Sequence, residues 1–583
     1  MKKFKLDSNF NPNIIKTLSN EELNVLSAEI RELIIDKVSM YGGHLGSNLG
    51  VVELTLSIFQ NFDLPKDKLI LDVGHQCYTY KIVTGRPLDN FRQQGGISGF
   101  QKRSESIYDC YEAGHSSTSI SAALGFAIAR DLKNEDHHVV CLIGDGSISN
   151  GLAFEGLNDL GASKHKVIVI INDNNMSIGK PVGRLHEMLE DIKDNKYNSH
   201  FFENLGFRYI NNVDGYDFDS LKKAFDEAKK ETKSVIVHVS TIKGKGYIHA
   251  ENDEDGYWHG VNKFDKLTGR EINSPNKDEA TWSKIYARGL ESLMASNEKI
   301  TVINPGTAVG SNLQRIMNRF SNRFFDVGIA EEHSLTLASG MALSNLHPYV
   351  SMYSSFLQRG YDQLNQDIAR MDLPVTLLID RSGLVGHDGE THQGIFDAAF
   401  MMNMPNISIA MAKDQKEALS LLKFSSNYNH PLAIRYPKGK TNYLRFDSLD
   451  KINELEYGCW IEELKAKDTN KCVITYGPVV TKLKEKLKGL NITLINAIFQ
   501  APLNEEYLKM SLKYSHIFVY DPYGIEQGFG YHIEHKLQEL NYKGKLHIKA
   551  IKNEFITHGS IDEQLDRYDL GIDEILNYIT NTK

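Results

Sequence analysis

The sequence predicts an α/β protein made of three consecutive α/β domains with largely parallel sheets. Short apolar runs alternate with stretches whose apolar residues recur at helical spacing along most of the chain. Strands joined by helices pair in parallel through crossover connections. With 583 residues the chain is also too long for one hydrophobic core. The predicted domains cover residues 1–275, 279–445 and 455–583.

The first domain is predicted to begin with a helix over residues 20–39, which has acidic residues early and is followed by a glycine pair. Strands and helices then alternate. Strands are predicted at 69–73, 138–146 and 166–174, separated by helices at 118–132 and 151–162. A polar stretch over 268–277 predicts a linker to the next domain.

The second and third domains are predicted from the same alternation. Strands of the second are expected at 299–306, 324–329, 348–353, 373–380 and 431–437, with a helix starting at Glu331. Strands of the third are expected at 471–477, 491–497 and 515–521, with a closing helix after Ser560.

Composition excludes several classes of protein. The longest apolar run, residues 167–171, suits a buried strand and is far too short to cross a bilayer. A net charge of −9 argues against general nucleic-acid binding but leaves room for a local anion pocket. The five cysteines show no CxxC pair, and no apolar stretch follows the first lysines as in a secretory signal. We therefore expect a cytoplasmic protein with no membrane and no nucleic-acid partner.

Two polar turns follow neighbouring predicted strands. GDGSISNG (144–151) lies where one strand ends and a helix begins, and NDNNM (172–176) ends the next strand. A right-handed crossover would bring both turns to the carboxyl edge of one sheet, where open α/β sheets bind ligands. Asp145, the side-chain oxygen of Asn174 and the carbonyl of Met176 are oxygen ligands suited to Mg²⁺. A lone GDG is a weak signal, since Asp-Gly turns are common, but the pairing favours a metal site.

This pair of turns resembles the diphosphate-and-magnesium motif of thiamine-diphosphate enzymes. Further segments make the chain similar to the 1-deoxy-D-xylulose-5-phosphate synthase family over nearly its whole length. They are GGHLGSNLG (42–50), LDVGHQCYTYKI (71–82), GHSSTSIS (114–121), KGKGY (243–247), IAEEH (329–333), YSSFLQRGYDQ (353–363), DRSGLVGHDGETHQG (380–394) and RYPKG (435–439).

The resemblance implies a transketolase-like fold and a transferase that depends on thiamine diphosphate and Mg²⁺. In that family pyruvate and D-glyceraldehyde 3-phosphate give 1-deoxy-D-xylulose 5-phosphate and carbon dioxide. The reaction is the first step of non-mevalonate isoprenoid (isoprene) biosynthesis, and its product also feeds thiamine biosynthesis. The resemblance further implies a homodimer.

Glu331 opens the predicted helix of the second domain. From position alone an acidic residue in the first turn would complement the helix dipole. The resemblance instead implies that Glu331 hydrogen-bonds N1′ of the cofactor's aminopyrimidine. A carboxyl group shielded from water can hold a proton near neutral pH, as this catalytic role requires.

Other roles also come from the resemblance. It implies cofactor binding by His75, Gly114, His115, Ser116, Gly146, Ser147, Asn174 and Tyr247. It implies that His44, His259 and His392 line the substrate cavity, with Asp388 helping to close it. A histidine taken alone is more often a structural residue than a catalyst, so turn placement adds only modest support.

Three arginines of the second domain resemble the phosphate-binding arginines of the family. They are Arg359, Arg381 and Arg435, and Tyr353 accompanies them. Each taken alone would be a surface charge. A guanidinium group suits the role because its planar fork matches phosphate oxygens.

Alternatives remain at this stage. A transketolase-like ketol transferase would share the cofactor motifs, and a cofactor-binding paralogue without full activity would share the fold. A dinucleotide-binding dehydrogenase lacks support because no GxGxxG opens a helix after a strand. The stretch between Met176 and Phe201 is shorter than in most members of the family, which puts cofactor affinity and turnover in question.

Overall fold

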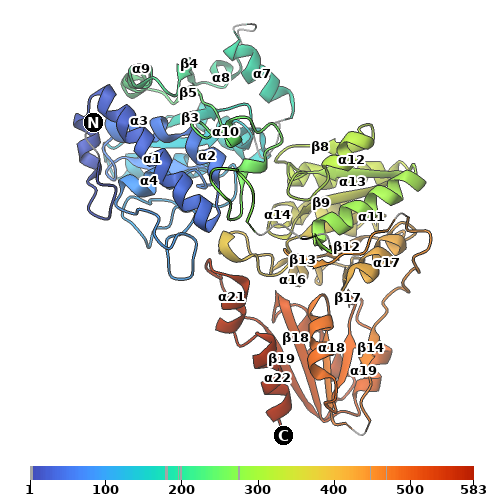
Figure 1. Cartoon of the computed structure of the whole chain (residues 1–583). Helices are drawn as coiled ribbons and strands as arrows, with labels where there is room; N and C mark the ends of the chain where they lie inside the picture. Colours follow the sequence, from blue (N-terminus) through green and yellow to red (C-terminus); the bar gives the residue numbers. More distant parts are fainter. Residues whose placement is uncertain are drawn as a thin grey trace. The chain divides into compact units, whose positions relative to one another are not determined.

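A computed structural model describes residues 4–176, 182–194, 196, 200–272, 276, 278–446, 448–467 and 469–583. The chain forms two compact units (Figure 1). Unit 1 is Met1–Ser274 with Gly328–Ala330, and unit 2 is Pro275–Val327 with Glu331–Lys583. The described residues contain sheets of five, seven and five strands, mostly parallel, and one two-stranded sheet. The predicted α/β fold class is confirmed.

The sheet of unit 1 is entirely parallel, with strand order β1-β2-β3-β5-β4. Its strands are β1 (Lys68–Leu71), β2 (Val139–Gly144), β3 (Ile168–Asp173), β4 (Arg208–Asp214) and β5 (Val235–Ser240). In β2, Val140 and Leu142 enter one hydrophobic core while Cys141 and Ile143 enter the other. Because alternate side chains of a strand point to opposite faces, both faces of this sheet are covered.

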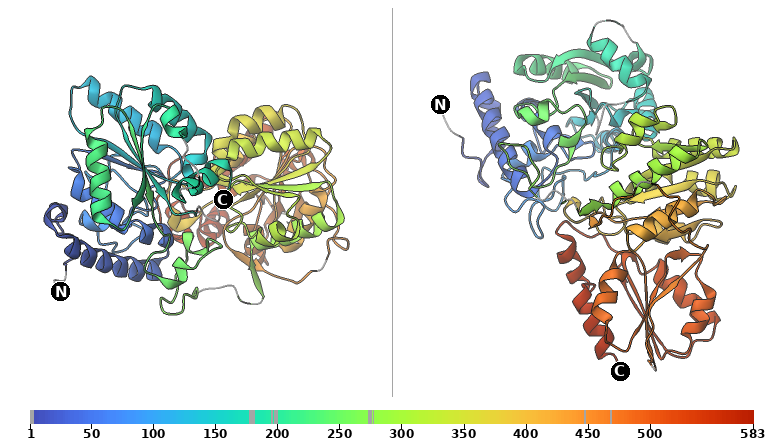
Figure 2. Two further views of the ribbon diagram at one scale, coloured as in Figure 1. Left: turned by 90° about the horizontal axis from the view of Figure 1, so that it is seen from above. Right: turned by 45° about the vertical axis from the view of Figure 1, so that its right-hand side comes forward.

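Helices pack on both sides of this sheet (Figure 2). The helices of unit 1 are α1 (Asn20–Tyr41), α2 (Leu45–Gly50), α3 (Val52–Asn61), α4 (Tyr78–Val83), α5 (Ser119–Leu132), α6 (Gly151–Ala162), α7 (Arg184–Lys193), α8 (Phe201–Asn204), α9 (Phe218–Lys230) and α10 (Ile248–Glu251). The long α1 begins at a capping box, in which Ser19 accepts from the backbone N–H of Glu22 and Glu22 accepts from Ser19.

Unit 2 contains the seven-stranded sheet, in the order β17-β11-β12-β10-β9-β7-β8. Its strands are β7 (Ile300–Asn304), β8 (Phe324–Asp326), β9 (His347–Tyr353), β10 (Thr376–Asp380), β11 (Ser408–Met411), β12 (Leu432–Arg435) and β17 (Phe499–Ala501). Its helices are α11 (Trp282–Ser296), α12 (Gln314–Arg319), α13 (Glu331–Leu343), α14 (Ser354–Leu357), α15 (Tyr361–Gln363), α16 (Asp397–Met401) and α17 (Gln415–Ser425). The short strands β6 (Glu279–Thr281) and β13 (Lys440–Asn442) pair antiparallel beside it.

The C-terminal sheet of unit 2 has the order β14-β16-β15-β18-β19. Its strands are β14 (Ile461–Leu464), β15 (Lys471–Thr475), β16 (Thr493–Asn496), β18 (His516–Ile525) and β19 (Lys545–Ile551). Helices α18 (Val479–Leu487), α21 (Ile561–Arg567) and α22 (Ile572–Asn581) cover one face, while α19 (Glu505–Ser511) and α20 (Phe529–Glu539) cover the other (Figure 1).

The structure differs from the expected division of the chain at one strand. β17 lies within the predicted third domain, but it pairs antiparallel with β11 of the seven-stranded sheet. The chain therefore returns once to the preceding sheet before it completes its own. The contacts also divide the chain into two units, with both later sheets in one of them. The exact domain boundaries stay a prediction.

Candidate active site

The metal half of the predicted site lies in unit 1, at the carboxyl edge of the sheet. Gly144 pairs with Asn172 across β2 and β3, and the backbone N–H of Asp145 donates to the carbonyl of Asn172 at 3.1 Å. The GDG and NDN turns therefore meet at one edge, as the sequence predicts. Asn174 Oδ1 accepts from the backbone N–H of Met176 at 3.0 Å, which closes the second turn.

Asp145 carries the clearest sign of a ligand. Its side chain is buried, and Oδ1 accepts from the Gly146 N–H at 2.9 Å. Oδ2 is buried too and has no hydrogen-bond partner among the residues that the structure describes. Burial, together with the nearby Asp173 carboxylate, raises the pKa of Asp145 to about 8. A buried carboxylate with an open oxygen is costly unless a cation pairs with it, so these residues fit a Mg²⁺ ion.

The second turn rests on a buried polar network. Asp173 Oδ2 lies 2.7 Å from His238 Nε2, and His238 Nδ1 lies 2.7 Å from the Tyr209 hydroxyl. Lys193, the last residue of α7, binds Asp173 Oδ1 at 2.8 Å and also contacts Asn175. Although burial opposes it, the partners His238 and Lys193 hold the pKa of Asp173 below its usual range. The network fixes the backbone on both sides of Asn174.

A neighbouring loop carries Gly114, His115 and Ser116. Asp72, directly after β1, accepts from the backbone N–H of Ser117 at 2.8 Å and of Ser119 at 3.1 Å. The Ser117 hydroxyl donates to the carbonyl of Ser147 at 2.7 Å. Asp72 therefore fixes the loop that carries the predicted cofactor residues, and Ser117 joins this loop to the turn that follows GDG.

Three histidines form one cluster in unit 1. The ring centroids of His44, His75 and His259 lie 5.2 to 5.5 Å from one another. Buried Asn48 holds two of them, because its amide donates to the carbonyls of His44 and His75 at 2.7 Å each. The structure thus brings together two predicted cavity residues and one predicted cofactor residue from separate loops.

Glu331 begins α13 in unit 2 and is 4% exposed. Burial raises the pKa of its carboxyl to about 7, against the attraction of Arg359. Arg359 Nη1 lies 3.5 Å from Glu331 Oε2. The carboxyl can therefore carry a proton near neutral pH.

A second cluster of unit 2 surrounds the loop after β10. The Arg381 guanidinium lies 3.7 Å from the centroid of the Tyr353 ring, and Tyr353 stacks on Phe356 at 5.3 Å. Phe356 in turn meets the His392 ring edge-on at 5.7 Å. Asp388, in the same loop, binds Lys438 at 2.9 Å. Four residues that the sequence predicts for substrate or catalysis are thus near one another.

Comparison with known proteins decides the family. Residues 6–200 and 188–241 match the family model described as 1-deoxy-D-xylulose-5-phosphate synthase. Residues 278–442 match a second family model, described as the pyrimidine binding domain of transketolase. The chain is 42% identical to a 1-deoxy-D-xylulose-5-phosphate synthase of Clostridium tetani, over 97% of each chain. It is 41% identical to that of Listeria monocytogenes, over 96% of this chain and 94% of the relative.

The chain belongs to the 1-deoxy-D-xylulose-5-phosphate synthase family. The predicted family and enzyme class, a transketolase-like transferase, are confirmed. The relatives' names do not favour a ketol transferase or an inactive paralogue. Among solved structures, a transketolase from Campylobacter jejuni is 17% identical with a TM-score of 0.45, over 97% of this chain and 100% of that one.

One predicted substrate residue is placed differently. Arg435 is fully buried, and its Nε and Nη2 bind both carboxylate oxygens of Asp397 at 2.7 and 2.9 Å. Nη2 also donates to the carbonyl of Tyr523 at 2.9 Å. In this structure a carboxylate occupies the two guanidinium nitrogens that would face a phosphate, and phosphate binding by Arg435 stays a prediction. Lys438, three residues on, is half-exposed beside Asp388 and is the better-placed cation.

Other polar residues of the site escaped the sequence prediction. Asp72 and Asn48 lie within the motifs of the sequence, but their side chains hydrogen-bond backbone atoms of distant loops. The spacing of residues in the sequence does not predict such contacts. Lys243 is buried, and desolvation lowers the pKa of its amine to about 8 even though the charge of Asp145 opposes this shift. The KGKGY motif was the available signal for Lys243. Tyr247 of that motif donates to the carbonyl of Lys266 at 3.0 Å, and its role in cofactor binding stays a prediction.

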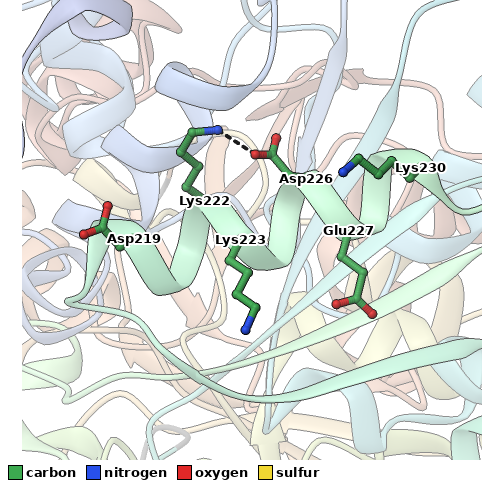
Figure 3. A pocket seen from close by; sticks show the side chains of 6 residues that line it. All are labelled: Asp219, Lys222, Lys223, Asp226, Glu227 and Lys230. Carbon is green, nitrogen blue, oxygen red and sulfur yellow. Dashed lines mark hydrogen bonds and ion pairs between the residues drawn. The ribbon is translucent and has the colours of Figure 1, made fainter.

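A depression of about 480 Å³ lies elsewhere, on the exposed face of α9 (Figure 3). It is lined by Asp219, Lys222, Lys223, Asp226, Glu227 and Lys230. Lys222 and Asp226 form an ion pair at 2.5 Å within the helix. The lining has three acidic and three basic residues and includes none of the predicted site residues, so this surface is a solvated helix face.

Proposed function

We propose that the chain decarboxylates pyruvate and joins the remaining two-carbon unit to D-glyceraldehyde 3-phosphate, giving 1-deoxy-D-xylulose 5-phosphate and carbon dioxide. This is the first step of non-mevalonate isoprenoid synthesis, with a product that also feeds thiamine biosynthesis. Family membership supports the proposal. The observation that carries it is Asp145, at the sheet edge among the predicted diphosphate-binding turns, because its buried Oδ2 has no hydrogen-bond partner within the described part of the chain.

Thiamine diphosphate and Mg²⁺ are the proposed cofactors. Asp145 Oδ2, the amide oxygen of Asn174 and the carbonyl of Met176 would hold the ion. The backbone at Gly146 and Ser147 would approach the diphosphate, and His75, His115, Ser116 and Lys243 would add donors. Bound thiamine diphosphate supplies a nucleophilic carbon and an electron sink for decarboxylation.

Glu331 would hold a proton toward the aminopyrimidine. With a pKa of about 7, its carboxyl is partly protonated at neutral pH and can act as a hydrogen-bond donor. Arg359 limits this shift by its positive charge, so the group stays able to lose the proton again. A carboxyl group with an ordinary pKa could not serve as a donor at this pH.

The two substrates present different anions. By resemblance, His44, His259 and His392 would act on pyruvate, while Arg381, Lys438 and Tyr353 would bind the phosphate of the aldehyde. The overall reaction consumes one proton, because the carboxylate leaves as neutral carbon dioxide while the new alcohol gains a hydrogen. Histidine is suited to supply that proton near neutral pH.

The remaining expectations concern the setting of the enzyme. The resemblance supports a homodimer, and five scattered cysteines without a CxxC pair support a reducing cytoplasm. Within the described ranges, none of the helices combines the length and the hydrophobicity that a membrane span would require. The partners we propose are the two substrates, without nucleic acid or membrane.

Labelled pyruvate tests the proposal. Pyruvate alone should release carbon dioxide slowly, and glyceraldehyde 3-phosphate should accelerate the release, with one deoxyxylulose phosphate formed for each carbon dioxide. The reason is that the site must protect the activated two-carbon unit from water until the acceptor arrives. Fast release without acceptor, with acetaldehyde as the main product, would identify a simple decarboxylase instead. Activity with a ketose phosphate donor in place of pyruvate would identify a ketol transferase.

A further inference from the structure

The loop of residues 381–394, here the substrate loop, connects β10 to α16 and carries Arg381, Asp388 and His392. Most of it has no regular secondary structure. Its two ends are joined by a bridge in which Gly383 and Gly394 exchange both backbone hydrogen bonds, at 2.5 and 2.8 Å. The shape of the loop between these ends must come from contacts with other segments.

Two buried glutamines connect the substrate loop to the segment before α21. Gln564 of α21 donates to the carbonyl of Gly386 at 3.2 Å and to the carbonyl of Thr557 at 2.8 Å. Gln393, inside the loop, accepts from the Val385 N–H at 2.8 Å and donates to the carbonyl of Ile556 at 3.3 Å. Both side chains are less than 5% exposed. Each glutamine thus satisfies backbone groups of the loop and of the C-terminal segment at once.

The backbones of the two segments also lie in close contact. Gly386 has a φ of +77°, and a Cβ atom there would lie 3.2 Å from the carbonyl oxygen of Gly559. A Cβ atom at Gly383, with a φ of +89°, would lie 3.0 Å from the Tyr523 ring. Glycine permits both the left-handed conformation and this approach.

Arg435 completes the arrangement at the far end of the loop. Its guanidinium binds Asp397, the first residue of α16, through two hydrogen bonds and the carbonyl of Tyr523 in β18 through a third. The buried pair therefore ties the end of the loop to the C-terminal sheet. A bidentate pair of this kind fixes orientation as well as distance.

We propose that the C-terminal sheet domain acts as a clamp that holds the substrate loop in its binding shape before substrate arrives. The clamp consists of Tyr523, Ile556 and Gln564, and Arg435 of β12 links Tyr523 to Asp397 at the end of the loop. Gln564 is a positioning residue, because its amide donates to carbonyls of the substrate loop and of the C-terminal segment. The proposal rests on the proposed function, in that the loop is taken to bind substrate. It gives the C-terminal domain a direct role in the reaction, although that domain carries none of the predicted catalytic residues.

Hydrogen exchange measured by mass spectrometry tests the clamp without any turnover. In the wild-type protein without ligands, the amides of residues 382–394 should be protected, because the substrate loop is already held. The variant Gln564→Ala should speed their exchange by about 10-fold or more, as expected for the loss of two buried hydrogen bonds. Gln538→Ala is the matched control, an exposed glutamine of α20, and should leave the loop unchanged.

Steady-state kinetics supply the second measurement. Gln564→Ala should lower kcat/KM for glyceraldehyde 3-phosphate by about 10-fold with unchanged thiamine-diphosphate affinity, since small misplacements of binding groups are costly. Equal loop exchange and equal kinetics in the Gln564 and Gln538 variants would refute the clamp. Rapid exchange of the loop amides in the wild-type protein would refute the clamp as well. This measurement does not need the variant, so it tests the proposal even if Gln564→Ala fails to fold. An enzyme that makes no deoxyxylulose phosphate, yet shows the protected loop, would refute the proposed function and not the clamp.

Discussion

Asp145 shows how one side chain can indicate an absent partner. Its carboxyl is buried, one oxygen is unpartnered among the described residues, and Asp173 adds repulsion. Such a group destabilises the metal-free protein and gains most from a bound cation. The same burial that costs stability therefore favours cofactor binding.

The variant Asp145→Ala should fold and should lose thiamine-diphosphate affinity in the presence of Mg²⁺ by at least about 100-fold, because an oxygen ligand of the ion is removed. Asn174→Ala should act in the same direction. Asp159→Ala, an exposed aspartate of α6, is the control. Calorimetric titration that finds wild-type affinity in Asp145→Ala would exclude Asp145 as a ligand.

Glu331→Gln should reduce turnover by about 10²–10⁴-fold while cofactor affinity is retained, since an amide can hydrogen-bond but cannot transfer the proton. In contrast to its turnover, the free energy of unfolding of the variant should be higher than that of the wild type. The folded pKa of about 7 exceeds the ordinary value of 4.5, so ionisation destabilises the wild type as pH rises through this range. Near pH 8 the variant should be more stable by about 3 kcal/mol, and near pH 5 by less than about 1 kcal/mol. Urea unfolding at both pH values measures the difference, and an equal gap at both would contradict the burial argument.

Arg381→Ala should lower kcat/KM for glyceraldehyde 3-phosphate by roughly 10- to 150-fold, because a hydrogen bond to a charged group is lost. Lys438→Met should lower the same kcat/KM by a smaller factor, since an ammonium group does not form the paired hydrogen bonds of a guanidinium group. Arg370→Ala, an exposed arginine, is the control. If pyruvate and the aldehyde are affected equally by Arg381→Ala, the residue has a structural role and does not bind phosphate.

At the level of elements, apolar patterning predicts most strands well. The predicted strand 166–174 contains β3, the predicted helix 20–39 lies within α1, and the expected closing helix is divided into α21 and α22. Buried parallel strands are continuous apolar runs, and their flanking turns are rich in glycine and aspartate. The strand β17 shows the limit of this reasoning, because its three residues do not reveal which sheet they join.

The strand β9 contains a pH-sensitive group that the reaction does not use. His347 is 8% exposed, and burial lowers the pKa of its imidazole to about 4, with Nε2 held at 3.1 Å from the Thr376 hydroxyl. Because the folded pKa of His347 lies below the ordinary value of 6.5, its contribution to stability is complete above that value and is lost as pH falls.

Between pH 7 and pH 5 this residue alone should reduce the stability of the wild type by about 2 kcal/mol. His347→Gln, which keeps a donor near Thr376 but cannot be charged, should lack this part of the pH dependence. Urea midpoints of both proteins across that range test the assignment. Parallel curves for the two proteins would show that another group titrates.

At the level of the whole molecule, cofactor and metal should stabilise the protein that binds them. Thiamine diphosphate with Mg²⁺ at about 100 times its dissociation constant should add roughly 2.7 kcal/mol to the stability of the part that binds it. A chelator should remove both the activity and this gain, and added Mg²⁺ should restore them. Scanning calorimetry with and without chelator measures the effect, with Asp145→Ala as the variant expected not to respond. A chelator that leaves the thermal transition unchanged would argue against a metal-held cofactor.

The sequence by itself determined the α/β class, the family and the chemistry-bearing turns of this protein. Apolar runs and glycine turns are local features, and the metal turns follow consecutive strands, so their meeting at one sheet edge follows from chain order and handedness. Residue types such as Asp145, Glu331 and the clustered histidines could be selected from motifs alone.

Only the tertiary structure decided which polar groups are available. Arg435 and Arg381 look alike in sequence, but Arg435 binds Asp397 and the Tyr523 carbonyl, while Arg381 lies against the Tyr353 ring and beside the neighbouring Asp380. Charged side chains are directed by partners that lie tens of residues away, and burial fixes which of those partners they keep. That is also why the roles of Asp72 and Asn48 could not be predicted, since a hydrogen bond between distant loops leaves no periodic trace in the chain.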